Sequence, residues 1–146
     1  MSKTAIVTLD KYLQKISNLQ NISALISWDQ QVMMPTGGAQ ARGEQISTLH
    51  GLIHEQQTSD VFKELIEKEE KKNFENDIWK KKMVEMARRE YNKQIKIPKE
   101  LVEKSAKLES EAFENWVKAR KENKFEIMIP YYTQVKKKFF FFLIRT

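Results

Sequence analysis

The chain of 146 residues contains no cysteine, only four glycines and only three prolines. Without cysteine it can form no disulfide, use no thiolate nucleophile and offer no cysteine ligand to a metal. Few glycines and prolines, with 32% charged and 40% apolar residues, are typical of a helix-rich soluble protein rather than a sheet or a disordered tail. The composition therefore predicts an all-α protein of about one domain. The lack of cysteine permits a reducing compartment, and we expect a cytoplasmic location.

Long apolar runs are also missing from the sequence. The first residues, MSKTAIVTLDKYLQK, contain no continuous apolar stretch followed by a small-residue cleavage site. No run approaches the roughly 18 apolar residues that are needed to cross a bilayer. We therefore expect neither secretion nor insertion into a membrane.

The net charge of +6 comes from the second part of the chain. Residues 61–146 carry 22 lysines and arginines against 15 acidic residues, whereas residues 1–60 carry 4 against 5. Lysine and glutamate alternate there, as in KELIEKEEKKNFENDIWKKK, and this pattern is typical of a solvated helix face. A nucleic-acid surface would gather its cations on one side, so the pattern argues against nucleic-acid binding.

Apolar residues that recur every three or four positions predict five or six helices, arranged as antiparallel hairpins. The first covers about residues 5–27 and should end between Trp28 and Met33, because Pro35 and the glycines that follow it favour a turn. Later helices are expected to begin near Ala39, after a cap at Thr58 or Ser59, around Trp79, at Pro98 and near Phe125. The expected buried faces include Ile22 and Ile26 in the first helix, Leu52 in the second, Val61 in the third, Trp79, Met83 and Met86 in the fourth, Trp116 and Val117 in the fifth, and Phe125, Ile129, Tyr132 and Val135 in the last.

The helical pattern ends at about residue 135. The sequence that follows, KKKFFFFLIRT, has four consecutive phenylalanines, no polar face and a high propensity for β structure and aggregation. We therefore divide the chain into a helical region, residues 1–135, and an aberrant Lys/Phe-rich tail, residues 136–146.

His50 and His54 are four residues apart, so one side of a helix could present both rings, as it presents two zinc ligands. The HExxH motif of zinc peptidases has a glutamate directly after its first histidine, whereas Gly51 follows His50 here. Two ligands without a third do not hold catalytic zinc, and we interpret the pair as ordinary surface or interface histidines.

The acidic residues in apolar surroundings form no convincing acid–base pair, and we expect them to cap helices or form salt bridges: Asp29, Glu44, Asp77 and Glu90. The sequence alone thus indicates no catalytic and no metal-binding residue.

An apolar turn lies between the first two expected helices. Trp28, Val32, Met33 and Met34 stand beside Pro35, and a cluster of this kind is costly to leave in water. It is either part of the core or a surface that contacts another body of protein.

The stretch ISALISWDQQVMMPTGGAQARGEQISTLHGLIHE resembles the N-terminal part of the carboxypeptidase Taq family of metallocarboxypeptidases. Its most specific portion is the string W-D-x-x-x-x-M-P-x-G-G-x-x-x-R-x-E-Q. The similarity continues through MARREYNKQIKIPKELVEKSAKLESEAFENWVKARKENKFEIMIPY and covers about residues 9–135. Of its nine fixed residues, eight are taken as the family signature: Trp28, Asp29, Met34, Pro35, Gly38, Arg42, Glu44 and Gln45.

The resemblance implies an all-helical peptidase, typically a homodimer, that removes single C-terminal residues from peptides with the help of zinc or cobalt. The family's metal ligands come from an HExxH helix and a later glutamate, well downstream of the matched region. No catalytic or metal-binding role can therefore be transferred to a residue of this sequence, and no cofactor is expected in this chain. The eight matching residues are expected to form part of the wall or cap of the substrate groove.

These features together predict an N-terminal fragment of a larger helical metallopeptidase that is inactive alone. The tail favours a truncation, such as a frameshift or an early end of the gene model. A peptide substrate is expected only if the catalytic part completes the protein, and exposure of normally covered helices makes self-association a further expectation. The alternative interpretation is a helical protein-interaction module without catalysis.

Overall fold

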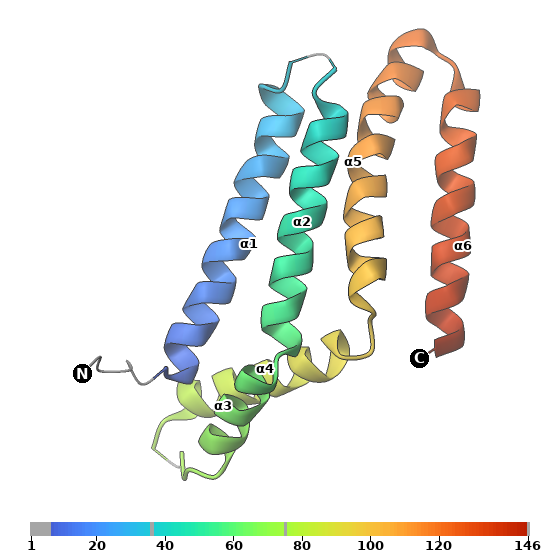
Figure 1. The fold of residues 1–146 in the computed structure, drawn as a ribbon. Helices are drawn as coiled ribbons and strands as arrows, with labels where there is room; N and C mark the ends of the chain where they lie inside the picture. Colours follow the sequence, from blue (N-terminus) through green and yellow to red (C-terminus); the bar gives the residue numbers. More distant parts are fainter. Residues whose placement is uncertain (1–6, 36, 75, 146) are drawn as a thin grey trace.

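The computed structural model describes residues 7–35, 37–74 and 76–145, and for residues 138–145 it describes the backbone alone. Every secondary-structure element in these ranges is a helix, so the all-α prediction is confirmed (Figure 1). Its elements are α1 (Leu9–Val32), α2 (Ala39–Thr58), α3 (Asp60–Glu70), α4 (Ile78–Gln94), α5 (Lys99–Glu122), the 3-10 helix η1 (Phe125–Met128) and α6 (Ile129–Arg145).

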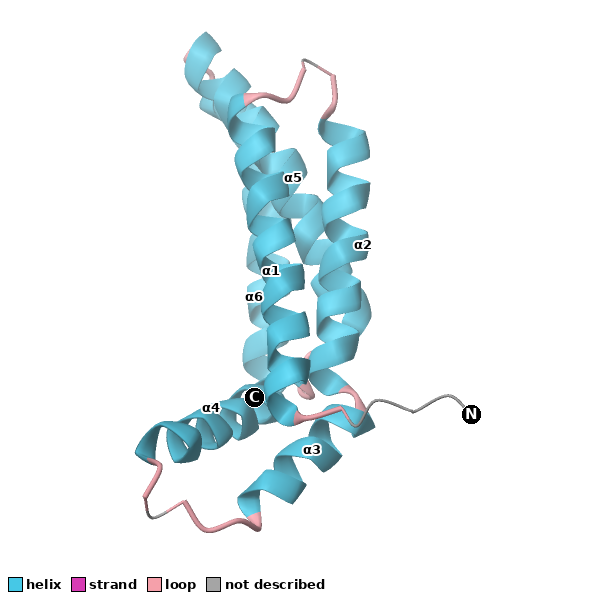
Figure 2. Cartoon of the chain, turned by 90° about the vertical axis from the view of Figure 1, so that its left-hand side faces the viewer, coloured by secondary structure: helices cyan, strands magenta, loops and turns pink. Residues whose placement is uncertain are grey.

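Four long helices lie side by side in the order α1, α2, α5 and α6, and each runs antiparallel to its neighbour (Figure 1). Helices α3 and α4 lie across one end of this layer, as the side view shows (Figure 2). The expected antiparallel hairpins are therefore present. Among the described residues, a second layer covers only the end of the long helices near α3 and α4 (Figure 2).

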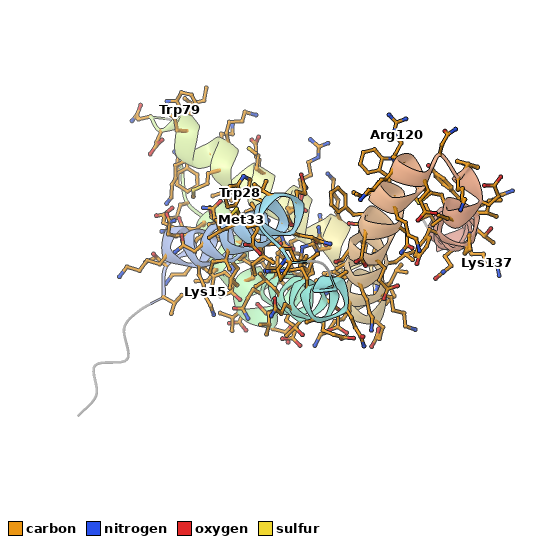
Figure 3. All side chains as sticks on the ribbon, turned by 90° about the horizontal axis from the view of Figure 1, so that it is seen from above. Lys15, Trp28, Met33, Trp79, Arg120 and Lys137 are labelled. Atoms are coloured by element: carbon orange, nitrogen blue, oxygen red, sulfur yellow. The ribbon has the colours of Figure 1, made fainter. Side chains whose placement is uncertain are left out.

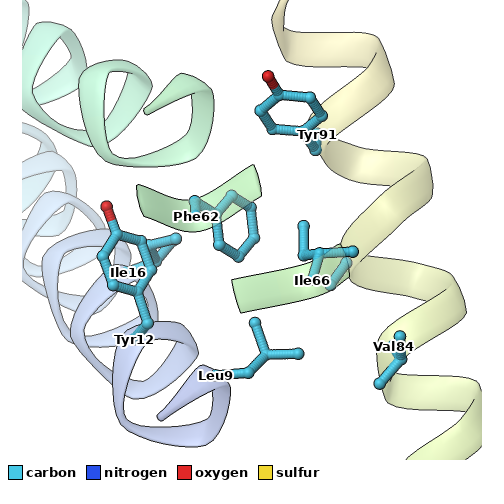
Figure 4. Close-up of a cluster of buried hydrophobic side chains, with 8 residues drawn as sticks. Leu9, Tyr12, Ile16, Phe62, Ile66, Val84 and Tyr91 are labelled. Atoms are coloured by element: carbon cyan, nitrogen blue, oxygen red, sulfur yellow. The ribbon is translucent and has the colours of Figure 1, made fainter. Parts of the chain in front are cut away.

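The main core lies where the first half of α1 meets α3 and α4 (Figure 4). Phe62 is its centre, because its ring stacks on Tyr12 at 5.3 Å and meets Tyr91 edge-on at 6.2 Å between ring centroids. Aromatic rings in these geometries attract one another beyond the effect of burial alone. The buried members of the cluster are Leu9, Tyr12, Ile16, Phe62, Ile66, Val84, Ala87 and Tyr91.

Side-chain caps set the start of three helices. Thr8 accepts a hydrogen bond from the Lys11 amide at 3.4 Å, so α1 begins at Leu9. The predicted start near Ala5 lies outside the described residues, and the observed start is later because the cap fixes it. Asp77 caps α4 in the same manner by accepting from the Lys80 amide at 2.9 Å.

Of the two predicted caps for α3, Ser59 is the one used. Its hydroxyl accepts from the Phe62 amide at 3.2 Å, whereas the Thr58 hydroxyl donates to the His54 carbonyl within α2 at 2.8 Å. Pro98 is the residue before α5 rather than its first residue, a difference of one position. The starts of α3, α4 and α5 are therefore predicted from the sequence to within about one residue, whereas the start of α1 is not.

An ion pair ties α3 to α4. The guanidinium of Arg88 donates to both carboxylate oxygens of Glu70, at 2.8 and 2.7 Å. This hydrogen bonding lowers the pKa of Glu70 and raises the pKa of Arg88 from their usual values. Both groups stay charged over the whole neutral range, so the contact persists there.

Several residues that were predicted to be buried are exposed, and this is the main correction to the sequence-based expectation. They lie where no second layer covers the long helices, or on the outer side of α4. Ile26 and Met83 are half-buried. The exposed ones are Ile22, Leu52, Trp79, Met86, Trp116, Val117, Phe125, Ile129, Tyr132 and Val135. Val61, which was predicted to lie on the apolar face of the third helix, is exposed on α3 as well.

The backbone of α6 continues as a helix from Ile129 to Arg145, through the phenylalanine run of residues 139–142, despite the β propensity of that run. The division of the chain at residue 135 stays a prediction. In the described ranges, no helix combines the length and the apolar character that a bilayer crossing would require.

Candidate functional site

The eight signature residues named above, which we call the hairpin motif, lie around the turn between α1 and α2. The carbonyl of Asp29 accepts from the amides of Met33 and Met34, both at 2.9 Å, and these bonds close the end of α1. The Pro35 carbonyl then accepts from the Gly38 amide at 3.0 Å, which turns the chain into α2. Proline thus ends the first helix at the position that the sequence predicts.

Asp29 and Arg42 form an ion pair that joins the two arms of the hairpin. The side chains are only 35% and 20% exposed, so the pair is partly shielded from solvent. Gly38 packs directly against Met34, since a Cβ at position 38 would come 2.9 Å from the Met34 Cγ. These four members of the hairpin motif hold the turn in shape.

Glu44 and its neighbours fasten the hairpin to α5. Glu44 accepts a hydrogen bond from the Lys107 ammonium, and this contact raises the pKa of Lys107. A second tie was not predicted from the sequence: the buried Gln30 amide donates to the carbonyl and the hydroxyl of Ser110, at 3.1 and 2.7 Å. The only available signal was a polar residue on the inner side of α1, and its partner is 80 positions away.

The side chains of the remaining members of the hairpin motif are exposed: Trp28, Pro35 and Gln45. Trp28 keeps 55% of its surface in contact with solvent. Seen along the long helices, Trp28 points away from α2, toward the side on which α4 carries Trp79 (Figure 3). The hairpin motif therefore divides into residues that build the turn and residues that face outward.

His50 and His54 lie at helix–helix interfaces, as one of the two sequence-based interpretations expects. The His50 ring is hydrogen-bonded to the Ser23 hydroxyl on α1 at 2.8 Å. The His54 Nε2 donates to the Gln94 carbonyl at the end of α4, at 3.2 Å. The two rings are thus hydrogen-bonded to different helices, His50 to α1 and His54 to α4. Within the described residues, no group of three or more His, Asp or Glu side chains could hold a metal, so these residues do not fit the zinc or cobalt of the family.

The isolated acids also take the structural roles expected of them. Asp77 caps α4, Glu90 accepts from the Gln94 side-chain amide at 2.7 Å, and Asp29 and Glu44 form the ion pairs described above. None of these contacts joins two carboxylates, so the acids offer no acid–base pair of the kind that hydrolysis uses.

We expect the Asp29–Arg42 pair to couple the two arms of the hairpin measurably. In a double-mutant cycle with Asp29→Asn and Arg42→Gln, the coupling free energy should be about 1 kcal/mol, because the pair is partly shielded and spans two helices. It should decrease at high salt. Urea denaturation of the four proteins measures it. The pair Lys82–Glu85, which is more exposed and lies within one helix, is the control and should give no measurable coupling, so equal coupling at both pairs would contradict this assignment.

The family model of the carboxypeptidase Taq (M32) metallopeptidases matches residues 8–138. The chain belongs to this family. Carboxypeptidase 1 of Bacillus subtilis is 33% identical over 123 residues, which are 84% of this chain and 25% of that protein. Thermostable carboxypeptidase 1 of Thermus thermophilus is 29% identical over 135 residues, which are 91% of this chain and 26% of that protein.

The fold of this M32 chain also matches a solved structure of the family. The crystal structure of BsuCP superposes with a TM-score of 0.83 at 32% identity, over 89% of this chain and 26% of that chain. The helices described above therefore correspond to the N-terminal portion of BsuCP. This chain spans about a quarter of the length of the curated relatives that it matches.

Proposed function

We propose that this chain supplies the N-terminal helical part of a metal-dependent carboxypeptidase, which releases C-terminal residues from peptides, and that it is inactive alone. The superposition on BsuCP carries the proposal, because the chain has the conformation of one quarter of a larger family member. Peptide substrate would then bind only when the rest of the family fold is present.

The donors on this chain support a structural rather than a chemical role. Both histidines are engaged in holding helices together, and catalytic zinc sites need three protein ligands and an open position for water. We place the metal ligands and the acid that activates water in the other three-quarters of the family fold. In the complete protein the metal would polarise the peptide carbonyl and activate a water molecule.

The hairpin motif would contribute position and shape. The Asp29–Arg42 pair and the Gly38–Met34 contact fix the turn, and Glu44 and Gln30 fix its attachment to α5. A rigid hairpin of this kind is suited to form part of the wall or cap of a substrate groove, where small displacements of a positioning element reduce activity strongly.

A chimera tests the proposal. Residues 8–138 of this chain replace the matching quarter of Bacillus subtilis carboxypeptidase 1, and release of C-terminal residues from a peptide is measured together with bound metal. We expect the chimera to hold the metal and be active, and the isolated chain to show neither property. The Bacillus protein without that quarter is the control for what the N-terminal part adds.

Two outcomes would contradict the proposal. One is an isolated chain that retains about one metal ion per molecule and trims peptides. The other is a folded chimera that stays inactive, and this result would favour the alternative of an interaction module without catalysis.

A further inference from the structure

We infer that the outer face of the second half of α1 is the surface on which the rest of the carboxypeptidase fold docks, an inference that rests on the proposed function. We call this surface the outer face of α1. It consists of Ile22, Leu25, Trp28, Val32 and Met33, all between 48% and 66% exposed.

The spacing of these residues places them on one side of the helix. Ile22, Leu25, Trp28 and Val32 follow one another at intervals of three, three and four positions, which is the period of a single helix face. The opposite side of the same half-helix contacts other helices of the chain. Ser23 is hydrogen-bonded to His50 of α2, and Gln30 is hydrogen-bonded to Ser110 of α5. The apolar side therefore points away from the other helices of this chain.

The same side of α1 changes character halfway along the helix. In the first half it carries Lys11, Gln14 and Asn18, which are exposed and polar, and the Gln14 amide donates to Asn18 at 2.9 Å. Apolar residues replace them only in the half that extends beyond α3 and α4 (Figure 2). A helix that was solvated along its whole length would need no such change, so the second half has the composition of a contact surface.

The hydrophobic effect favours burial of the outer face of α1 under a large protein surface. Full burial of one Leu, Ile or Val side chain contributes about 1.5–3 kcal/mol, and here four large apolar residues stand in one row with Met33 beside them. Apolar anchors at helical spacing are the pattern by which a helix lies in the groove of another body of protein. A single small ligand would leave most of this row in water.

The family fold supplies an occupant of the right size. This chain superposes on BsuCP over 89% of its own length but accounts for only 26% of that chain. About three-quarters of the family fold thus lies outside the helices described here. We assign the outer face of α1 to that portion, and a second copy of this chain is the competing occupant.

Single cysteines test the docking surface, because the natural chain has none. Leu25→Cys and Val32→Cys probe the outer face of α1, and Leu52→Cys, at an exposed leucine on α2, is the matched control. Each is introduced into the isolated chain and into the active chimera described above. Maleimide alkylation of the peptide that contains the new cysteine is then followed by mass spectrometry.

In the isolated chain the three thiols should react at similar rates. In the chimera the thiols at positions 25 and 32 should react at least about tenfold more slowly, since a covered thiol reacts only after local opening, while the thiol at position 52 should not change. Unchanged rates at positions 25 and 32 in an active chimera would overturn the inference and leave the proposed function intact. Equal slowing at all three positions would overturn the restriction of docking to α1.

Two further results separate the remaining cases. Slowing at positions 25 and 32 in the isolated chain, growing with protein concentration, would assign the face to a second copy and overturn the inference. An inactive but folded chimera would count against the proposed function, whereas the thiol rates in that chimera would still decide whether the outer face of α1 is covered.

Discussion

Replacing Phe62 with alanine is expected to lower the free energy of unfolding by about 3–5 kcal/mol. Phe62 is 1% exposed, and its ring joins Tyr12 of α1 to Tyr91 of α4. The substitution leaves a cavity at the point where three helices meet, in the part of the chain that has a second layer (Figure 4). Because small domains are stable by only about 5–15 kcal/mol, the variant should lose most of its helix content well below the urea midpoint of the natural chain.

The neighbouring residue provides the control for Phe62. Val61 is 52% exposed on the same helix, and Val61→Ala should change the free energy of unfolding by less than about 0.5 kcal/mol. Urea denaturation followed by circular dichroism measures both variants. Similar losses for the two substitutions would show that the aromatic cluster does not dominate the stability of the chain.

The position and ends of the helices could be predicted from the sequence because local residues determine them. Ser59 caps α3 with its own side chain, and Pro35 with the glycines that follow it ends the first hairpin arm. The hairpin motif could also be recognised, because its members lie within 18 consecutive positions, residues 28–45. Each of these features depends on residues only a few positions apart.

Burial could be predicted only in part, because it depends on where other helices lie. Trp79 and Met86 follow the same period on α4 as Ala87 and Tyr91, yet only the latter two face the core. On α1, the predicted apolar stripe contains both Ile16 and Ile22, but these residues are six positions apart and lie roughly 120° apart around the helix, so Ile16 faces the core and Ile22 faces outward. The period of a helix shows which sides are apolar but not which of them another layer covers.

The contacts of the candidate site could not be predicted from the sequence, because they too depend on where other helices lie. The spacing of His50 and His54 correctly places both on α2, but it does not reveal that their partners come from α1 and α4. The partners of Glu44 and Gln30 are 63 and 80 positions away on α5. Pairings over such separations follow from the arrangement of the helices and not from any local pattern.

The adjacent glycines of the hairpin are expected to be required for two different reasons. Gly37 has φ of +92°, and no atom lies within 4 Å of a Cβ placed there, so Gly37→Ala should cost about 1–2 kcal/mol through backbone strain alone. Gly38 has an ordinary helical backbone, but a Cβ there would lie 2.9 Å from the Met34 Cγ and 3.1 Å from the Pro35 carbonyl oxygen. Gly38→Val should therefore cost about 1–3 kcal/mol through overpacking.

Shortening Met34 separates the two causes. In the Met34→Ala background the penalty of Gly38→Val should decrease, because the nearest side-chain atoms are gone, while contact with the Pro35 carbonyl keeps part of it. The penalty of Gly37→Ala should not change, because no side chain causes it. Urea denaturation of the single and double variants gives both coupling free energies. A Met34→Ala substitution that relieved both glycine variants equally would show that the whole turn relaxes as a unit, and the steric account of Gly38 would then be wrong.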